Sequence, residues 1–140
     1  MFEKLYEHRL ASWRAFRNRL ELSNDPLQEV IDFYNNAPNV SVHTDPWDNS
    51  MWPGPWELIN ENQYCEFSRV LGQCYSLQLT ERFKETNFEI HISTDNSLSI
   101  VYLLYVGDLV IGWDDKTYVH KDKISTTFMS QKAYIMPSLQ

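Results

Sequence analysis

Apolar side chains recur at every third or fourth position over residues 2–22, with charged residues between them. This spacing places them on one stripe of a helix. The stripe consists of Phe2, Leu5, Tyr6, Leu10, Trp13, Phe16 and Leu20. The run SNDPLQ that follows predicts a new helix start, with Asp25 as N-cap, Pro26 at the first helical position and Gln28 at the third. A second, short helix is therefore expected over residues 26–34.

A third helix is expected over residues 63–83, and it carries both cysteines. Its broad apolar face consists of Phe67, Val70, Leu71, Cys74, Leu77 and Leu79. Gly72 in mid-helix costs roughly 1 kcal/mol relative to alanine, so we expect another element to pack closely against it. Cys65 lies near the helix start and Cys74 nine residues later, which at ~100° per residue turns them to opposite sides. We expect no disulfide between them, and a buried structural role for Cys74.

The chain beyond residue 87 reads as β-structure. In the run FEIHISTD every second residue from Phe88 is apolar, and LSIVYLLYV at 98–106 is apolar on both faces, as in a central strand. Gly107–Asp108 is a hairpin turn signal, and LVIGWDD is the returning strand. The runs KTYV and TTFMSQKAYIM are expected to add strand or helix. Helices followed by a small antiparallel sheet predict an α+β fold.

The hairpin also predicts a strand register. A two-residue loop at Gly107–Asp108 places Asp114 opposite Val101. The first strand should turn its apolar side chains to the more apolar face of the sheet, and a three-residue loop after it achieves this. His91 would then lie beside Val101, and a row of His91, Val101 and Asp114 would cross three strands.

Residues 37–56 have neither a helical nor a strand period, and we expect an ordered loop there, with a turn of helix following at residues 55–60. The loop holds Trp47, Trp52 and Trp56 among several prolines. Side chains of this size bury area or favour association. The tryptophans therefore fold over the core, or they form a cleft wall or a partner surface, and the pattern leaves both open.

A chain of 140 residues is expected to form one domain. It divides into a helical part at 1–36, a tryptophan- and proline-rich loop at 37–62, and a helix with a sheet at 63–140. The net charge is −7; residues 1–22 hold five basic and three acidic side chains, which leaves −9 elsewhere. Such an acidic body repels phosphates, so nucleic acid is not an expected partner. No oligomeric state is indicated.

No apolar run approaches the ~18–20 residues of a membrane span, and the start MFEKLYEHRL does not resemble a signal peptide. With only two cysteines, this predicts a reducing cytoplasm. His43 with Asp45, and His91 with Asp95, offer metal ligands, but nothing repeats at zinc-site spacing. No glycine-rich phosphate loop occurs. We therefore expect neither a metal nor a cofactor.

A cysteine at a helix start followed by three strands, over residues 63–115, resembles the transglutaminase-like (papain-like) core of cysteine hydrolases and acyltransferases. A helix N-terminus lowers the pKa of a thiol. The resemblance implies that Cys65 is the nucleophile and that Asp114 matches the family's aspartate. The family's histidine position on the middle strand holds Val101 here. His91 on the neighbouring strand would have to act as the base, in a dyad with Cys65, because it would lie nearly 10 Å from Asp114 at ~4.8 Å per strand.

The run DPWDNSMWPGPWELINENQYCEFSRVLGQCYSLQLTERF also resembles small proteins of marine T4-like cyanophages, which implies a phage product acting in a bacterial cytoplasm. Two functions follow. The first is a non-catalytic interaction module that binds another protein or a peptide through Trp47–Trp56 and the cleft above Cys65, and the incomplete triad favours it. The second is a cysteine acyltransferase or hydrolase with Cys65 as nucleophile, His91 as base and Asp114 as an electrostatic partner.

Overall fold

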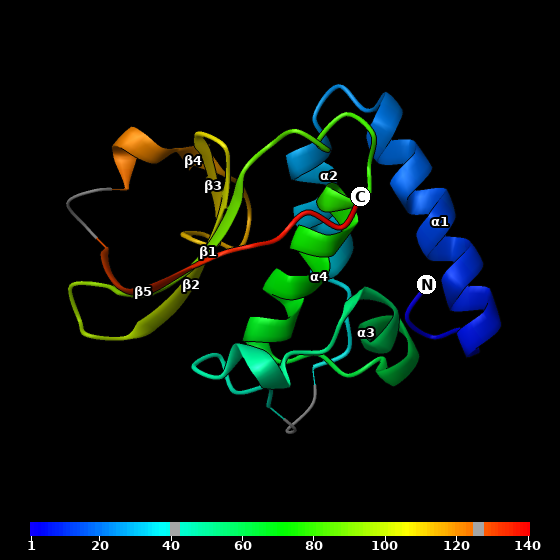
Figure 1. Ribbon diagram of the computed structural model, residues 1–140, viewed down its shortest axis with the longest axis horizontal. Coiled ribbons are helices and arrows are strands. Elements are labelled where there is room, and N and C mark those ends of the chain that lie inside the picture. Colours follow the sequence, from blue (N-terminus) through cyan, green and yellow to red (C-terminus); the bar gives the residue numbers. More distant parts are fainter. Residues whose placement is uncertain (40–42, 125–127) are drawn as a thin grey trace.

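The structure, a computed structural model, describes residues 1–39, 43–124 and 128–140. These residues form helices in the first half of the chain and an antiparallel sheet in the second, which confirms the α+β fold. Figure 1 shows the sheet on one side, α1 on the other, and α4 between them. The helices are α1 (Tyr6–Leu22), α2 (Pro26–Tyr34), α3 (Pro55–Glu61) and α4 (Glu66–Gln78). The strands are β1 (Phe88–Thr94), β2 (Ile100–Val106), β3 (Leu109–Ile111), β4 (Val119–His120) and β5 (Met129–Ile135).

The two N-terminal helices follow the predicted patterns, with one difference at the start. α1 begins at Tyr6 rather than at residue 2, and Phe2 instead packs as a separate buried side chain against the rings of Phe33, Tyr34 and Tyr64. The later part of the stripe is buried as expected, through Trp13, Phe16 and Leu20.

The start of α2 is confirmed in detail. The helix has Asp25 as its N-cap, with the backbone N–H of Gln28 donating to Asp25 Oδ1 at 3.5 Å, and Pro26 in the first turn. A carboxylate at this position satisfies one of the backbone donors that a helix leaves free.

The helix α4 is the centre of the core. Eleven of its thirteen residues are buried, and it contacts α1, α2, α3 and β2. It is shorter than predicted: Asn62, in the left-handed conformation, ends α3, and Cys65 is the N-cap of α4 rather than a residue inside it. A Cβ added at Gly72 would lie 2.8 Å from Tyr34 Cζ and closer still to Cε1. The predicted close packing at Gly72 is therefore confirmed.

The sheet has the strand order β4-β3-β2-β1-β5, with the antiparallel pairing expected of hairpins. The Gly107–Asp108 hairpin pairs Val106 with Leu109, as predicted. The register between β1 and β2 is wrong by two residues, because His91 pairs with Leu103 and not with Val101.

The error lies in the turn that joins β1 to β2. The carboxylate of Asp95 accepts hydrogen bonds from the backbone N–H groups of Ser97 and Ser99, at 2.8 and 3.0 Å. Leu98 takes a left-handed conformation with φ of 63°. The side chain of Asp95 thus stabilises a five-residue connection in place of three. Because the shift is even, the assignment of side chains to the two faces of the sheet survives it.

The placement of Asp114 opposite Val101 is also wrong. β3 ends at Ile111, and Gly112 follows with φ of 110° and lies close to the carbonyl oxygen of Tyr102, which a Cβ at this position would overlap. A side chain at position 112 would overlap that oxygen, so the glycine permits the chain to leave the sheet here. Asp114 therefore lies in a loop and not in a strand.

Both faces of the sheet are covered. The face toward α4 joins the main core through buried side chains that include Ile90, Leu104 and Ile111. The opposite face carries a second, smaller cluster around Leu103, Val110 and Ile124. Of the two segments that were expected to add strand or helix, Val119–His120 and Met129–Ile135 are strands; part of the second segment lies outside the described residues.

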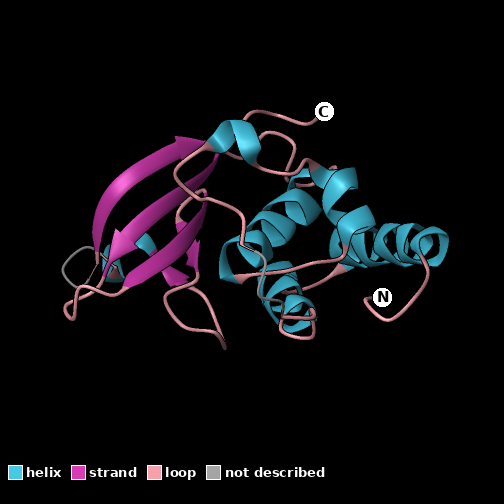
Figure 2. Cartoon of the chain, turned by 90° about the horizontal axis from the view of Figure 1, so that it is seen from below, coloured by secondary structure: helices cyan, strands magenta, loops and turns pink. Residues whose placement is uncertain are grey.

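The predicted loop at 37–56 contains a short 3-10 turn at Asn49–Met51, and α3 follows it close to the predicted turn of helix. Residues 40–42 of this loop lie outside the described part. Figure 2 shows the curved sheet standing beside the helices rather than among them.

Candidate functional site

The backbone around Cys65 is positioned by two neighbouring segments. Tyr64 forms a parallel β-bridge with Asn39, which brings the end of the α2 connection beside the start of α4. The backbone N–H of Cys65 donates to the hydroxyl of Ser68 at 2.8 Å, and the Cys65 sulfur lies 3.3 Å from that hydroxyl. Ser68 is itself buried. The thiol is therefore held in place at the N-terminus of α4.

The electrostatic surroundings favour the thiolate of Cys65. Burial raises the pKa of the thiol, but hydrogen bonds from the hydroxyl and the backbone of Ser68 lower it. Backbone hydrogen bonds from Thr44 and Phe67 lower it further, and together they outweigh burial, so the pKa lies below its ordinary value. The N–H groups at a helix N-terminus stabilise negative charge in this way. Cys74 differs, because burial alone raises its pKa far above the ordinary range.

Cys65 lines a cavity of about 640 Å³ that also contacts His43, Thr44, Pro46 and Tyr102. His43 thus shares a cavity with the cysteine, and its side chain is exposed. The sequence suggested His43 only as a possible metal ligand. The segment that carries it has no period, and no pattern in the sequence relates it to the start of α4.

The structure does not bring His91 to Cys65. His91 pairs with Leu103, whose side chain belongs to the small cluster on the face of the sheet away from α4. Its Nδ1 lies 3.0 Å from the Ser130 hydroxyl, and its ring lies 4.3 Å from that of Tyr105. Cys65, by contrast, belongs to the main core on the α4 side. The sheet itself therefore separates the two members of the predicted dyad.

Asp114 is also apart from Cys65. Its Oδ1 accepts a hydrogen bond from the backbone N–H of Lys116 at 2.7 Å, which closes a turn in the loop after β3. Its side chain lines a different cavity, together with Val101. Asp114 and Val101 thus line one cavity without being a strand pair. The sequence-predicted triad is held in three separate places.

The three tryptophans of the loop have different surroundings. Trp52 packs between the rings of Phe67 and Tyr134, at 4.9 and 4.7 Å, and its indole N–H donates to the carbonyl oxygen of Asp45 at 3.0 Å. Trp47 and Trp56 are 47% and 51% exposed. Trp52 therefore folds over the core, which was one expectation for this loop, and the other two leave area free for a partner, which was the alternative.

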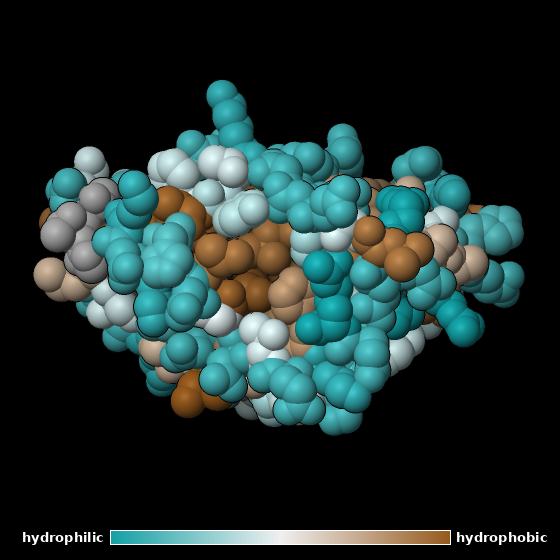
Figure 3. All heavy atoms as spheres, turned by 90° about the horizontal axis from the view of Figure 1, so that it is seen from above, coloured by the Kyte–Doolittle hydropathy of each residue, from teal (hydrophilic) through white to brown (hydrophobic). Residues whose placement is uncertain are grey.

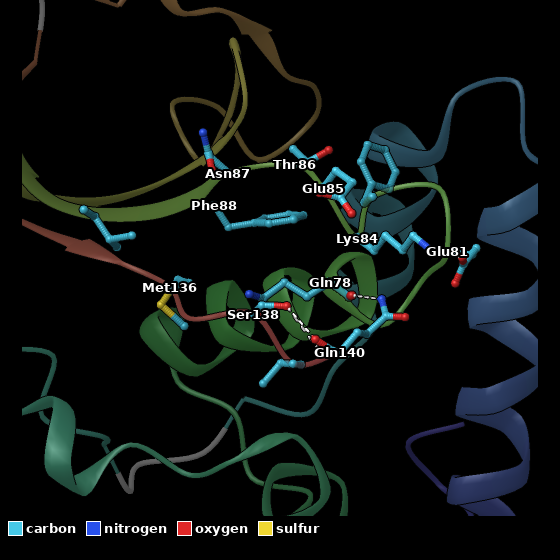
Figure 4. A pocket seen from close by; sticks show the side chains of 13 residues that line it. Gln78, Glu81, Lys84, Glu85, Thr86, Asn87, Phe88, Met136, Ser138 and Gln140 are labelled. Carbon is cyan, nitrogen blue, oxygen red and sulfur yellow. Dashed lines mark hydrogen bonds and ion pairs between the residues drawn. The ribbon is translucent and has the colours of Figure 1, made fainter.

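Another cavity, of about 570 Å³, lies between the end of the chain and the segment that leads into β1 (Figure 4). The side-chain amide of Gln140 donates to the carbonyl oxygens of Gln78 and Thr80, at 2.6 and 2.8 Å. Lys84 and Glu81 form an exposed ion pair at its edge. The Gln140 amide and the Lys84–Glu81 pair therefore already have partners within the protein.

Figure 3 shows a hollow with an apolar floor between hydrophilic side chains on the face seen from above.

In the described ranges, no group of three or more histidine, cysteine, aspartate or glutamate side chains is placed to hold a metal ion. None of the helices among these residues has both the length and the apolar character needed to cross a lipid bilayer.

Comparison with models of known protein families gives no match, and a search of the curated proteins finds none. The resemblance to transglutaminase-like enzymes and to cyanophage proteins therefore stays a prediction.

Proposed function

We propose that this protein is a protein-interaction module on a transglutaminase-like scaffold, and that it binds a basic segment of a partner protein. The observation that carries the proposal is the exposure of Trp47, Met51 and Trp56 within ten residues, where Met51 is 69% exposed. We call these three side chains the aromatic surface. Tryptophan is among the residues that contribute most to binding energy in protein interfaces.

The charge of the same segment specifies the partner. Residues 43–62 hold four carboxylates and neither lysine nor arginine. All four are exposed, namely Asp45, Asp48, Glu57 and Glu61. Exposed indole rings bind cations through their faces, and carboxylates beside them add Coulomb attraction. A partner segment with lysine or arginine next to apolar side chains complements this surface.

The separation of the triad supports a binding role. A base must lie within hydrogen-bond reach of the nucleophile it serves. His91 and Asp114 do not meet this condition at Cys65: the sheet separates His91 from the thiol, and the Asp114 carboxylate accepts from the Lys116 N–H and lines a different cavity.

The proposal predicts that a ten-residue peptide of alternating arginine and leucine binds, and that its glutamate–leucine analogue does not. Trp47→Ala should weaken binding of the basic peptide at least tenfold, because it removes one of the two exposed indole rings of this segment. Trp47 is preferred to Trp56 because the Trp56 ring packs against Trp13 at 6.0 Å. Fluorescence anisotropy of the labelled peptide measures the affinity.

Leu22→Ala is the matched control, since Leu22 is an exposed apolar side chain on α1, outside the aromatic surface. It should leave the affinity unchanged. Equal binding of the two peptides, or full binding by the Trp47 variant, would contradict the proposal. Added salt should weaken the interaction because the charges are exposed.

A second candidate is a cysteine acyltransferase or hydrolase in which His43, and not His91, serves Cys65. The lowered pKa of the thiol and the shared cavity favour it. The Cys65 thiolate would add to the carbonyl carbon of an ester or amide, and protonated His43 would give its proton to the leaving group. Water would then cleave the thioester, with its proton taken up by His43.

Iodoacetamide labelling against pH tests this candidate in a Cys74→Ser variant. Labelling of Cys65 should reach half its maximal rate clearly below the ordinary thiol pKa of about 8.5, because the thiolate is stabilised. His43→Ala should then abolish turnover of a model ester without abolishing labelling. A rate that rises only near pH 8.5 would exclude the enzyme and leave the interaction module untouched.

A further inference from the structure

A further cavity, of about 260 Å³, lies where the loop before α3, the helix α4 and the end of β5 meet. The loop contributes Trp52 to its lining, α4 contributes Tyr75 and Gln78, and β5 contributes Tyr134. The cavity shares no lining residue with the cavity of Cys65, and the side chains of the aromatic surface do not line it. It is therefore separate from both sites described above.

The hydroxyl of Tyr134 is the unusual group of this cavity. Tyr134 is the buried residue of an otherwise exposed strand and is only 9% exposed. Its hydroxyl is buried as well and forms no hydrogen bond to any residue that the structure describes. The other buried polar side chains of the lining have partners. The Tyr75 hydroxyl donates to the Pro53 carbonyl oxygen at 2.6 Å, and the Gln78 amide donates to that of Pro137 at 3.0 Å.

Packing does not explain why this position holds a tyrosine. The ring of Tyr134 lies 4.7 Å from the ring of Trp52, and the Lys132 ammonium lies 5.2 Å from its centre. Phenylalanine would make the same ring contacts. A buried hydroxyl without a partner destabilises a fold, whereas an apolar group in the same place does not. A ligand oxygen that forms a hydrogen bond with the Tyr134 hydroxyl explains the tyrosine.

Lining and size limit what that ligand can be. Among the described residues that line the cavity there is no aspartate, glutamate, lysine, arginine or histidine. A charged ligand would lose its hydration here without gaining an ion pair. The rings of Trp52, Tyr75 and Tyr134 suit an aromatic body, which packs edge to face against other rings. An apolar cavity of about 150 Å³ already holds a benzene ring, so this cavity admits one ring with small substituents.

We propose that this cavity binds a neutral, single-ring phenol. The ligand hydroxyl and the Tyr134 hydroxyl form a hydrogen bond, which either can donate because a hydroxyl is both donor and acceptor. The ring of the ligand lies against Trp52 and Tyr75. This site requires neither peptide binding by the aromatic surface nor a reactive Cys65.

p-Cresol, toluene and p-toluate test the proposal, because they share a methyl-substituted ring and differ in the group opposite the methyl. p-Cresol is neutral at pH 7, like tyrosine with its pKa of about 10. In ¹H–¹⁵N spectra of the labelled full chain, p-cresol should shift the indole N–H of Trp52 and leave that of Trp113, in the loop after β3, unchanged. Toluene should bind at least fivefold more weakly, and p-toluate should shift neither signal. No Trp52 shift with p-cresol, equal binding of p-cresol and toluene, or preference for p-toluate would overturn the proposal.

Two variants separate binding from folding. Tyr134→Phe removes the hydroxyl without a partner, so p-cresol should bind it as weakly as toluene does, while the melting temperature stays the same or rises. Tyr75→Phe is the matched control: it removes a hydroxyl that has a partner, so it should lower the melting temperature and keep the preference for p-cresol. A retained preference for p-cresol in the Tyr134 variant would refute the site. Trp47→Ala should leave p-cresol binding unchanged, which separates this site from the aromatic surface.

Discussion

At the scale of single residues, the core depends on how closely Tyr34 approaches α4. Gly72 leaves room for the Tyr34 ring, and the Tyr34 hydroxyl then lies 3.0 Å from the buried hydroxyl of Ser76. The same Ser76 oxygen accepts the indole N–H of Trp13 at 2.9 Å. Burial raises the pKa of Tyr34 well above its ordinary value, so the phenol stays neutral and fully able to hydrogen-bond. Because Gly72 has no side chain, Tyr34 of α2 reaches Ser76 of α4, and Ser76 also bonds Trp13 of α1. The three helices are therefore linked at this point.

Gly72→Ala is expected to destabilise the protein by about 1–3 kcal/mol, because the new methyl group overlaps the Tyr34 ring. The intrinsic helix propensity of alanine works in the opposite direction, by roughly 1 kcal/mol. Urea denaturation measures the net effect. In a Tyr34→Leu background the same change should become neutral or stabilising. A stabilising effect of Gly72→Ala in the wild-type protein would show that the close approach does not exist.

At the scale of elements, His91 of β1 contacts residues of the sheet, among them Glu89 and Ser130, and not Cys65. Burial lowers the pKa of His91, and the carboxylate of Glu89, 3.7 Å from Nε2, opposes that shift without cancelling it. At this distance the pair attracts through charge rather than through a normal hydrogen bond. The position of β5 matters here, since it supplies the Ser130 hydroxyl that contacts Nδ1.

This shift gives a pH dependence of stability. In the unfolded chain His91 takes up a proton near pH 6.5, at its ordinary pKa of about 6.5, and in the folded protein only at lower pH. Above pH 6.5 the His91 side chain is neutral in both the folded and the unfolded state, so it does not change the free energy of unfolding. As the pH falls below it, the unfolded state binds the proton first, and the free energy of unfolding decreases. His91→Gln should remove this part of the acid sensitivity in urea denaturation between pH 7 and 5.

His8→Gln is the matched control, because His8 is an exposed histidine on α1. It should leave the pH dependence unchanged. The prediction is wrong if the free energy of unfolding of the His91 variant has the same slope against pH as that of the His8 variant and the wild-type protein. His91 would then titrate in the folded protein as it does in the unfolded chain.

At the scale of the whole molecule, the main core runs without interruption from the helices into the sheet. Buried side chains connect Trp13 in α1, Leu71 in α4 and Ile90 in β1 within one cluster. Figure 1 shows α4 between α1 and the sheet. A domain boundary would need a linker that few contacts cross, and α4 contacts both halves.

The chain is therefore expected to unfold in one cooperative step. Tryptophan fluorescence reports mainly on the helical half, where four of the five tryptophans lie, whereas far-UV circular dichroism reports on both halves. The two urea curves should coincide. Separate midpoints for the two signals would contradict the prediction of one domain over residues 1–140.

Several features were readable from sequence because their cause is local. The capping of α2 by Asp25 and the Gly107–Asp108 hairpin depend on a few adjacent residues. The face of the sheet that each side chain occupies follows from alternation alone. The close packing at Gly72 was also predictable, since glycine in mid-helix lowers helix stability and is usually explained by the close approach of another element.

The candidate site was predicted only in part, because its geometry depends on pairs of segments. The register between β1 and β2 depends on the length of a turn that Asp95 stabilises, and alternation cannot distinguish three residues from five. β3 ends where Gly112 meets Tyr102, a contact between strands. These two contacts decide where His91 and Asp114 lie.

By itself, the sequence determined the fold class, most helix and strand positions, and the placement of Cys65 at a helix N-terminus, since each follows from periodicity or from neighbours along the chain. Only the tertiary structure decided that His43 shares the cavity of Cys65 while His91 lies behind the sheet. The physical reason is that loops without a period and the packing of distant segments set these distances, and neither has a signature in the order of residues.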